Sequence, residues 1–243
     1  MTLDGAVALV TGAGKRVGRA IALALAQRGA RVAVHYNGSA AGAAETVRMI
    51  AAAGSTAHAV QASLLDADAA RQLVDGVVSR FGQIDLLVNS AASMTRTPFG
   101  AVTAAEWDEI FALNLRAPFF LAQAAATALT ARDGAIVNIA DHMGDEPTAG
   151  FLPHGVSKSA VVALTRHLAI AMAPRVRVNA VIPGAVLMPE GVSAAFVAAF
   201  AETTPLRRLG TPEDVAGAVV YLAEAPYVTG EALHVDGGRH ARS

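Results

Sequence analysis

Asp141, His154 and Lys158 have the types and spacing needed to move a proton. His154 and Lys158 are four residues apart, so on a helix they share one face and can point into one pocket. A neutral imidazole is a poor proton donor, and its protonated form has an unperturbed pKa of about 6.5. The Lys158 charge disfavours imidazolium, whereas the Asp141 carboxylate favours it. We therefore expect an Asp141–His154 pair that acts as a general acid, worth roughly 10²–10⁴-fold in rate. The alternative is that His154 only packs or hydrogen-bonds, and that Asp141 or water supplies the proton.

A glycine-rich stretch could bind phosphate. Gly12, Gly14 and Gly18 lie between an apolar run, residues 6–10, and an apolar helical pattern that ends at Gly29. Glycines at this spacing allow a tight turn, close approach of the backbone to a pyrophosphate, and close packing of a helix on a strand. The phosphates would lie at a helix N-terminus, which attracts anions. The stretch predicts a dinucleotide site, although many strand–helix turns need glycines for backbone reasons alone.

The residues after the second expected strand indicate which dinucleotide would bind. In such sites a carboxylate that ends this strand usually binds the ribose 2′-hydroxyl of NAD. Here the strand, residues 31–35, is followed by residues 36–39 (YNGS), and the next acid is Glu45. The glycine loop itself contains Lys15 and Arg16, which suit a 2′-phosphate. We therefore expect NADPH rather than NADH, with solvated loop charges as the alternative.

Strand and helix signals alternate along most of the chain, as in a parallel sheet covered by helices. The expected strands are residues 6–10, 31–35, 56–60, 85–89, 134–140, 176–181 and 232–235. After the first helix, the expected helices are about 40–53, 66–81, 104–131, 154–173 and 212–224, with the 104–131 helix kinked or divided at Pro118. Pro183-Gly184 opens a segment expected to be irregular. We predict an α/β fold with one doubly wound parallel sheet in a single domain, residues 1–243, and a ligand beyond the carboxyl ends of the strands.

Composition argues against several kinds of partner. The 243 residues carry a net charge of −1, so nothing indicates nucleic acid. The uncharged tract 117–131 is too short for a membrane span, and no membrane association is expected. The opening residues, MTLDG, show no export signal, so we expect a cytoplasmic location. The absence of cysteine excludes thiol catalysis, and 53% hydrophobic against 16% charged residues fits a homo-oligomer.

Further motifs follow in order: TGAGKRVG at residues 11–18, Asn89-Ser90-Ala91, Asn114, Asn138, Lys158, Asn179, Pro183-Gly184, and the tail from TPEDVA to VDGG. With this ordered set the whole chain resembles the short-chain dehydrogenase/reductase family. Within the family, Lys15-Arg16, His35-Tyr36 with Ser39, and Asp141 in place of serine are similar to pteridine reductases and bacterial dihydromonapterin and dihydrofolate reductases. The resemblance implies a Rossmann-type fold of about seven strands, NADPH, a homotetramer, and hydride transfer to a C=O or C=N bond.

Three positions depart from the pattern of these relatives. The family's catalytic tyrosine stands four residues before its lysine, where this chain has His154. Met94 stands where pteridine reductases have an aromatic residue that holds the pterin ring against the nicotinamide. Ser63 replaces an aspartate near the adenine. The resemblance also implies that Asn114 holds a water linking the lysine to solvent; a buried asparagine that satisfies a helix kink fits the sequence equally well.

The expected site follows from these residues and from the resemblance. The expected catalytic residues are Asp141, His154, Lys158 and Asn114. The expected cofactor-binding residues are Gly12, Gly14, Lys15, Arg16, Val17, Gly18, His35, Tyr36, Asn37, Ser39, Ser63, Leu64, Asn89, Ser90, Ala91, Lys158, Pro183, Gly184 and Val186. The expected substrate pocket is Ser93, Met94, Met143, Phe151, Leu187 and Met188, with a lid at residues 186–189. The tail, residues 239–243, would reach a neighbouring subunit's site or fray. No metal is expected, because residues 141–146 match no compact ligand set.

The sequence leaves three functions open. The first is an NADPH-dependent reductase of a C=N or C=O bond in a small cyclic, pterin-like substrate, which Asp141 favours. The second is a reductase of the same fold for a non-pterin ketone or imine, with Met94 and His154 marking a reshaped pocket. The third is a catalytically weak NADP-binding sensor or oligomer partner, with the missing tyrosine as the sign of lost activity. Retention of Lys158, Asn114 and Asp141 argues against the third.

Overall fold

A seven-stranded parallel sheet forms the centre of the computed structural model, which describes residues 1–188, 191 and 193–241. The strand order is β3-β2-β1-β4-β5-β6-β7, and each strand pairs in parallel with its neighbours. The strands are β1 (Val7–Val10), β2 (Arg31–Tyr36), β3 (Ala57–Gln61), β4 (Leu86–Asn89), β5 (Ala135–Ile139), β6 (Arg177–Pro183) and β7 (Ala232–Val235). All residues of β1, β4 and β5 are buried, as expected where helices cover both faces. The sheet confirms the predicted fold class.

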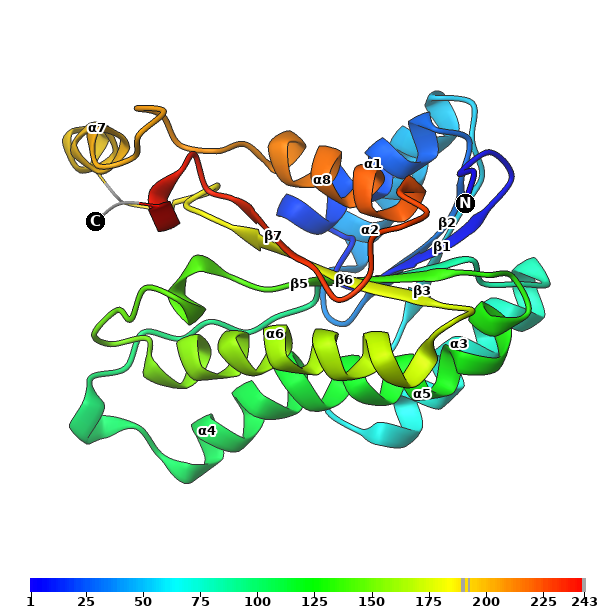
Figure 1. Ribbon diagram of the computed structural model, residues 1–243, viewed down its shortest axis with the longest axis horizontal. Helices are drawn as coiled ribbons and strands as arrows, with labels where there is room; N and C mark the ends of the chain where they lie inside the picture. The colour runs from blue at the N-terminus through cyan, green and yellow to red at the C-terminus, as the bar shows by residue number, and fades with distance from the viewer. Residues whose placement is uncertain (189–190, 192, 242–243) are drawn as a thin grey trace.

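Helices cover the two faces of this sheet in separate layers (Figure 1). One layer contains α1 (Arg16–Gln27), α2 (Ala40–Ala52) and α8 (Pro212–Glu224), and the other contains α3 (Ala67–Phe81), α5 (Ala117–Thr130) and α6 (Leu152–Met172). The first layer packs side chains such as Ile21 and Leu222 into one core. The second packs Leu73, Leu121 and others into another core. The two cores therefore lie on opposite faces of the sheet.

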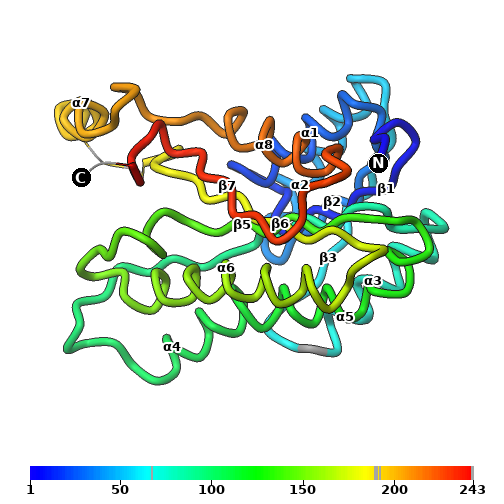
Figure 2. The backbone as a smooth tube through the Cα atoms, in the orientation of Figure 1, coloured from blue at the N-terminus to red at the C-terminus, as the bar shows by residue number. Residues whose placement is uncertain are grey.

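The order of the strands creates a crevice at one end of the sheet. On one side of β1 lie β2 and then β3 at the sheet edge. On the other side lie β4, β5, β6 and finally β7 at the opposite edge. The loops that leave β1 and β4 therefore diverge, and doubly wound folds bind ligands at this switch point. Figure 2 shows the chain beyond β6 running out to α7 (Ala194–Glu202) at one end of the molecule.

The helix predicted over residues 104–131 is divided in the structure. α4 (Ala104–Phe111) continues into a π-helical turn, η2 (Ala112–Arg116), and α5 begins at Ala117. The backbone stays helical from η2 into α5, so Pro118 lies inside a continuous helical path, where a proline removes one N–H donor. The division therefore falls just before the proline. π-Helical turns are frequent at functional sites, and this one carries the buried Asn114.

The segment after Pro183, expected to be irregular, contains α7. The Ser193 hydroxyl accepts the Phe196 N–H at 3.2 Å and caps this helix. Ser193 followed by an alanine-rich run was the available sequence signal. Within the described ranges, no helix combines the length and the apolar character that crossing a membrane requires.

Candidate active site

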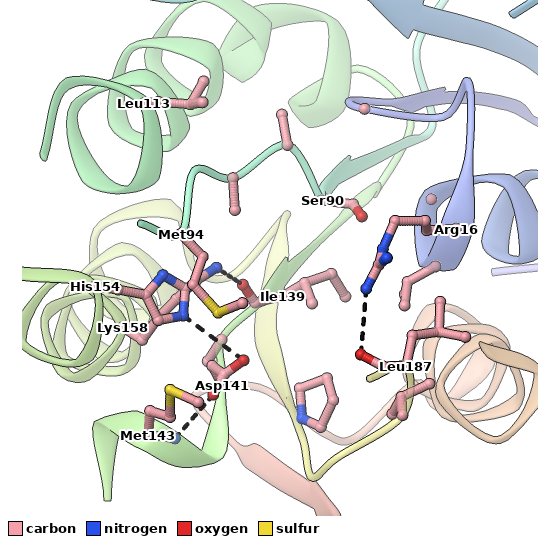
Figure 3. A pocket seen from close by; sticks show the side chains of 18 of the residues that line it. Arg16, Ser90, Met94, Leu113, Ile139, Asp141, Met143, His154, Lys158 and Leu187 are labelled. Carbon is pink, nitrogen blue, oxygen red and sulfur yellow. Dashed lines mark hydrogen bonds and ion pairs between the residues drawn. The ribbon is translucent and has the colours of Figure 1, made fainter. Parts of the chain in front are cut away.

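A cleft of about 1160 Å³ opens at the carboxyl ends of the strands. Its lining begins at the glycine loop after β1, passes the ends of β2, β4 and β5, and continues to the start of α6 and the segment after β6. Figure 3 shows Arg16 on one side of this space and His154 with Asp141 on the other. The cleft thus joins the predicted phosphate-binding and proton-transfer residues.

The glycine loop is packed too tightly for side chains. Gly12 has a φ of 67°, and a Cβ there would lie 3.0 Å from the Ala91 Cα. A Cβ on Gly18 would lie 2.3 Å from the Gly12 carbonyl oxygen, so α1 packs directly on the loop. The Thr11 hydroxyl accepts the N–H groups of Ser90 at 2.9 Å and Ala91 at 3.0 Å, which fixes the facing wall. This is the geometry that a backbone cradle for phosphate requires.

The buried ring of His35 connects the glycine loop to the end of β3. Its Nδ1 accepts the Gly12 N–H at 3.2 Å, and its Nε2 lies 3.2 Å from the Ala62 carbonyl oxygen. This pairing assigns the proton of the neutral ring to Nε2. Burial lowers the pKa of His35 to about 4, against a smaller rise from the hydrogen bond to Ala62. Although His35 was predicted to bind cofactor, its two ring nitrogens contact Gly12 of the glycine loop and Ala62 after β3.

Arg16 connects the glycine loop to the segment after β6. Its φ of 53° lies in the left-handed region, and its Nη2 donates to the Leu187 carbonyl at 3.3 Å (Figure 3). Lys15, beside it, also lines the cleft, and the β2 end contributes Asn37 and Ser39 rather than a carboxylate. An anion in this part of the cleft would meet two cations and hydrogen-bonding groups.

The proton-transfer residues meet where β5 ends and α6 begins. His154 Nε2 lies 3.7 Å from Asp141 Oδ2, an ion-pair contact longer than a hydrogen bond (Figure 3). Among the described residues, this buried nitrogen has no hydrogen-bond partner. A buried imidazole with an unpaired nitrogen at the cleft can donate a proton to a bound ligand.

The other ring nitrogen fixes the orientation of His154. Nδ1 lies 3.0 Å from the Ser93 carbonyl oxygen, which assigns a proton to Nδ1. Asn114 holds Ser93 from both sides: its Oδ1 accepts the Ser93 N–H at 2.8 Å, and its Nδ2 donates to the Ser93 carbonyl at 3.0 Å. Asn114 Nδ2 also donates to the Ser157 hydroxyl at 3.0 Å. Asn114 thus supports the imidazole from behind, while its predicted water-holding role stays a prediction.

Lys158 places a buried amine at the floor of the cleft. Its Nζ donates to the Ile139 carbonyl at 2.7 Å. Burial lowers the pKa of Lys158 to about 8, although the charge of Asp141 raises it. The amine is therefore mostly protonated at neutral pH and faces the same space as His154.

His142 is a titratable residue of the site that the sequence analysis missed. A 3₁₀ turn, η3 (His142–Gly144), brings its Nδ1 to 3.2 Å from Asp141 Oδ1, which also accepts the Met143 N–H at 2.9 Å. Burial alone would raise the pKa of Asp141, but the neighbouring imidazoles of His142 and His154 hold it well below its usual range. Burial lowers the pKa of His142, but the contact with Asp141 raises that pKa by more, so the net change is a rise. Asp141 is therefore a stable carboxylate between two imidazoles.

Comparison with known proteins identifies the family. The sequence family described as "Enoyl-(Acyl carrier protein) reductase" matches residues 12–240. The 3-oxoacyl-[acyl-carrier-protein] reductase FabG of Staphylococcus aureus is 37% identical over 239 residues, which cover 96% of this chain and 97% of the relative. The chain belongs to the short-chain dehydrogenase/reductase family. An uncharacterized oxidoreductase of Methylorubrum extorquens is 40% identical over 245 residues, covering 97% of this chain and 98% of the relative.

The fold of this short-chain dehydrogenase/reductase also matches solved structures. The crystal structure of a blue fluorescent protein from a metagenomic library, in complex with NADPH, has a TM-score of 0.91 and 34% identity. The match covers 98% of this chain and 99% of that chain. The Rossmann-type fold implied by the sequence resemblance is confirmed.

Most of the predicted site residues line the cleft, but four do not: Ser63, Asn89, Ser93 and Asn114. Ser63 is exposed, and Asn89 Nδ2 donates to Asn138 Oδ1 at 2.8 Å, which braces β4 against β5. Lining residues that the sequence analysis missed include Arg96, Glu109, His142, Phe196, Phe200 and Arg239. Arg239 pairs with Glu146 of its own chain at 2.7 Å. Pro189 of the predicted lid and residues 242–243 of the tail lie outside the described residues.

Proposed function

We propose that this member of the family is an NADPH-dependent reductase that transfers hydride to a C=O or C=N bond, with His154 as the proton donor. The observation that carries the proposal is the buried Nε2 of His154, which has no hydrogen-bond partner in the described part of the chain and lies 3.7 Å from Asp141 in the cleft that begins at the glycine loop. A fixed imidazole beside a carboxylate is suited to general acid catalysis.

The residues present fit NADPH. The crowded positions at Gly12 and Gly18 leave bare backbone for a pyrophosphate, and Lys15 with Arg16 suits a 2′-phosphate. The blue fluorescent protein with the same fold is described in complex with NADPH, which supports this choice. When bound, NADPH would supply the hydride from its nicotinamide ring.

The chain's own residues would orient the substrate and handle the proton. Ser93 and Asn114 hold the imidazole, so that Nε2 stays directed at the cleft. Asp141 stabilises the imidazolium, and a proton would pass from Nε2 to the oxygen or nitrogen of the reduced bond. The Lys158 charge, next to Asp141, would favour return of the ring to its neutral form.

Two substrate classes have support. An open-chain ketone is favoured by the 3-oxoacyl reductase among the relatives and by apolar lining side chains such as Met94, Met143 and Phe151. A pterin-like ring is favoured by the similarity of Lys15-Arg16, His35-Tyr36 and Asp141 to pteridine reductases. Met94, which is 45% exposed, gives that ring no aromatic surface to stack on.

The test is NADPH oxidation with dihydrobiopterin, dihydrofolate, a cyclic imine, a diketone and a 3-oxoacyl thioester. Turnover of only the thioester or the diketone supports an open-chain ketone as the substrate. Turnover of the pterins supports a pterin-like ring as the substrate. Tight NADPH binding with no turnover of any of these compounds would overturn the proposed reductase function. It would favour a catalytically weak NADP-binding sensor or oligomer partner.

Two further features of the proposal concern assembly and location. We expect a homotetramer, supported by exposed apolar side chains on the outer helices, such as Phe119 on α5 and Ile170 on α6. A cytoplasmic location remains a prediction from the sequence.

A further inference from the structure

A second hollow lies beside the catalytic end of the cleft. It has a volume of about 670 Å³ and shares four lining residues with the cleft: Arg96, Met143, Thr148 and Phe151. Its other walls come from Pro98 and Phe99 before α4, from residues 147–150, and from the first turns of α6. In Figure 3, Met143 lies next to Asp141, on the side away from Arg16. The two spaces therefore meet at the proton-transfer residues, far from the predicted phosphate end.

The walls of the second hollow are mainly apolar. They include Pro98, Phe99, Met143, Pro147, Ala149, Phe151, Leu152 and Val156. The Ser159 hydroxyl already donates to the Gly144 carbonyl at 2.6 Å, and no carboxylate lies among the lining residues that the structure describes. Phe99 is 82% exposed and Val156 is 45% exposed, so both present apolar surface that a ligand could cover.

We propose that this hollow is a subsite for the aliphatic tail of the molecule that is reduced in the cleft. The inference rests on the proposed reductase function and favours an open-chain ketone over a compact ring. A carbonyl held at His154 has its tail directed past Met143, whose flexible thioether side chain adapts to different chains. The shared residues make the hollow a continuation of the substrate pocket, and an apolar chain matches its lining.

The first test is a series of 3-oxoacyl N-acetylcysteamine thioesters of increasing chain length, reduced with NADPH. We expect kcat/KM to rise about two- to fourfold for each added methylene until the hollow is filled. Val156→Trp, which fills the hollow, should reduce the long-chain to short-chain ratio of kcat/KM at least tenfold. The matched control is Ala163→Trp, which adds the same bulk to an exposed α6 position outside the hollow and should keep the native ratio. Equal kcat/KM at all lengths, or equal ratios in the two variants, overturns the subsite.

A binding measurement separates this proposal from the reductase itself. Decan-2-ol, which NADPH cannot reduce, is titrated calorimetrically into the NADPH-saturated native protein and both variants. The expected result is a Kd at least tenfold weaker for Val156→Trp than for Ala163→Trp. This result, together with no turnover of any thioester, would reject the proposed reductase function but support the subsite. Thioester turnover together with equal decan-2-ol binding in both variants would support the reductase function but reject the subsite. Loss of subunit association in Val156→Trp, with unchanged decan-2-ol binding, would reassign this face to a contact between copies of the chain.

Discussion

His154 uses one ring nitrogen for its own placement and leaves the other for chemistry. Nδ1 donates to the Ser93 carbonyl, whereas Nε2 faces Asp141. The pKa of Asp141 is held well below its usual range by His142 and His154, so this carboxyl stays ionised throughout an ordinary assay range.

We expect His154→Phe to lower kcat of the reductase by roughly 10²–10⁴-fold, because the general acid is lost. The measurement is the initial rate of NADPH oxidation at neutral pH, with His167→Phe, an exposed histidine of α6, as the matched control. Equal kcat values in native protein and His154→Phe would remove His154 from the mechanism.

The buried amine of Lys158 predicts a conflict between stability and function. Burial lowers its pKa to about 8 in the folded protein from the ordinary value of 10.5, so the charged form opposes folding at pH 7. Between pH 8 and 10.5 the unfolded chain holds more protons, so this cost disappears as pH rises through that window. Lys158→Met should therefore raise the free energy of unfolding at pH 7 by about 1–3 kcal/mol. This gain is smaller than the free energy equivalent to the whole pKa shift, because the hydrogen bond to the Ile139 carbonyl is lost.

Urea unfolding of native protein and Lys158→Met at pH 7 and about pH 10 measures this difference. The variant should gain stability at pH 7, show a smaller gain at the higher pH, and lose reductase turnover. A variant that is less stable than native protein at pH 7 would show that the hydrogen bond to Ile139 outweighs the cost of burying the charge.

Single residues show where sequence reasoning about the site succeeded and where it could not. The four-residue spacing of His154 and Lys158 indicated a shared face, and the structure brings both into the cleft. His142 was missed because its approach to Asp141 depends on the 3₁₀ turn after β5, and that turn has no strong sequence signature. The position of Arg239 depends on how the chain after β7 folds back onto Glu146. Local spacing therefore found contacts within one regular helix, but not the contact set by an irregular turn or the contact made by long-range packing.

At the scale of elements, α1 depends on the absence of a side chain at Gly18. A Cβ there would lie 2.3 Å from the Gly12 carbonyl oxygen, so Gly18→Ala must push α1 away from the loop. We expect a loss of about 1–3 kcal/mol in unfolding free energy and weaker NADPH binding. Gly76→Ala in α3 is the matched control: nothing lies within 4 Å of its added Cβ, and alanine favours helix, so it should gain up to about 1 kcal/mol. Chemical denaturation and NADPH fluorescence titration test both variants; equal stability changes would contradict the packing role of Gly18.

The same scale explains which elements the sequence predicted well. Strands β1, β4 and β5 are short apolar runs with turn residues around them, and each was placed within one or two residues. The division of the 104–131 helix, expected from Pro118, occurs at η2, in the turn just before the proline, because a proline removes an N–H donor from a helix. The helix α7 was missed, because the run AAFVAAFAE shows no clear polar face and follows a proline–glycine turn.

At the scale of the whole molecule, the glycine loop links cofactor binding to the stability of the fold. His35, on β2, joins the loop through Gly12 and the end of β3 through Ala62, so one neutral ring connects three strand ends. This arrangement needs Nδ1 as an acceptor, and protonation of the ring would remove it. The fold should therefore be sensitive to acid at this position.

We expect the protein to lose stability as the pH falls from 6.5 to about 4, through the titration of His35. Burial lowers the pKa of His35 from 6.5 to about 4, so across this window the unfolded chain binds a proton that the folded protein does not. At about 1.4 kcal/mol for each pH unit, the full effect is about 3 kcal/mol, present above pH 6.5 and lost below about pH 4. His35→Gln, whose amide can also accept from Gly12 and donate to Ala62, should remove this part of the pH dependence. His58→Gln, at an exposed position of β3, should keep it. The measurement is the unfolding free energy in urea at intervals between pH 4 and 7, and equal slopes for native protein and His35→Gln would show that another group controls the acid response.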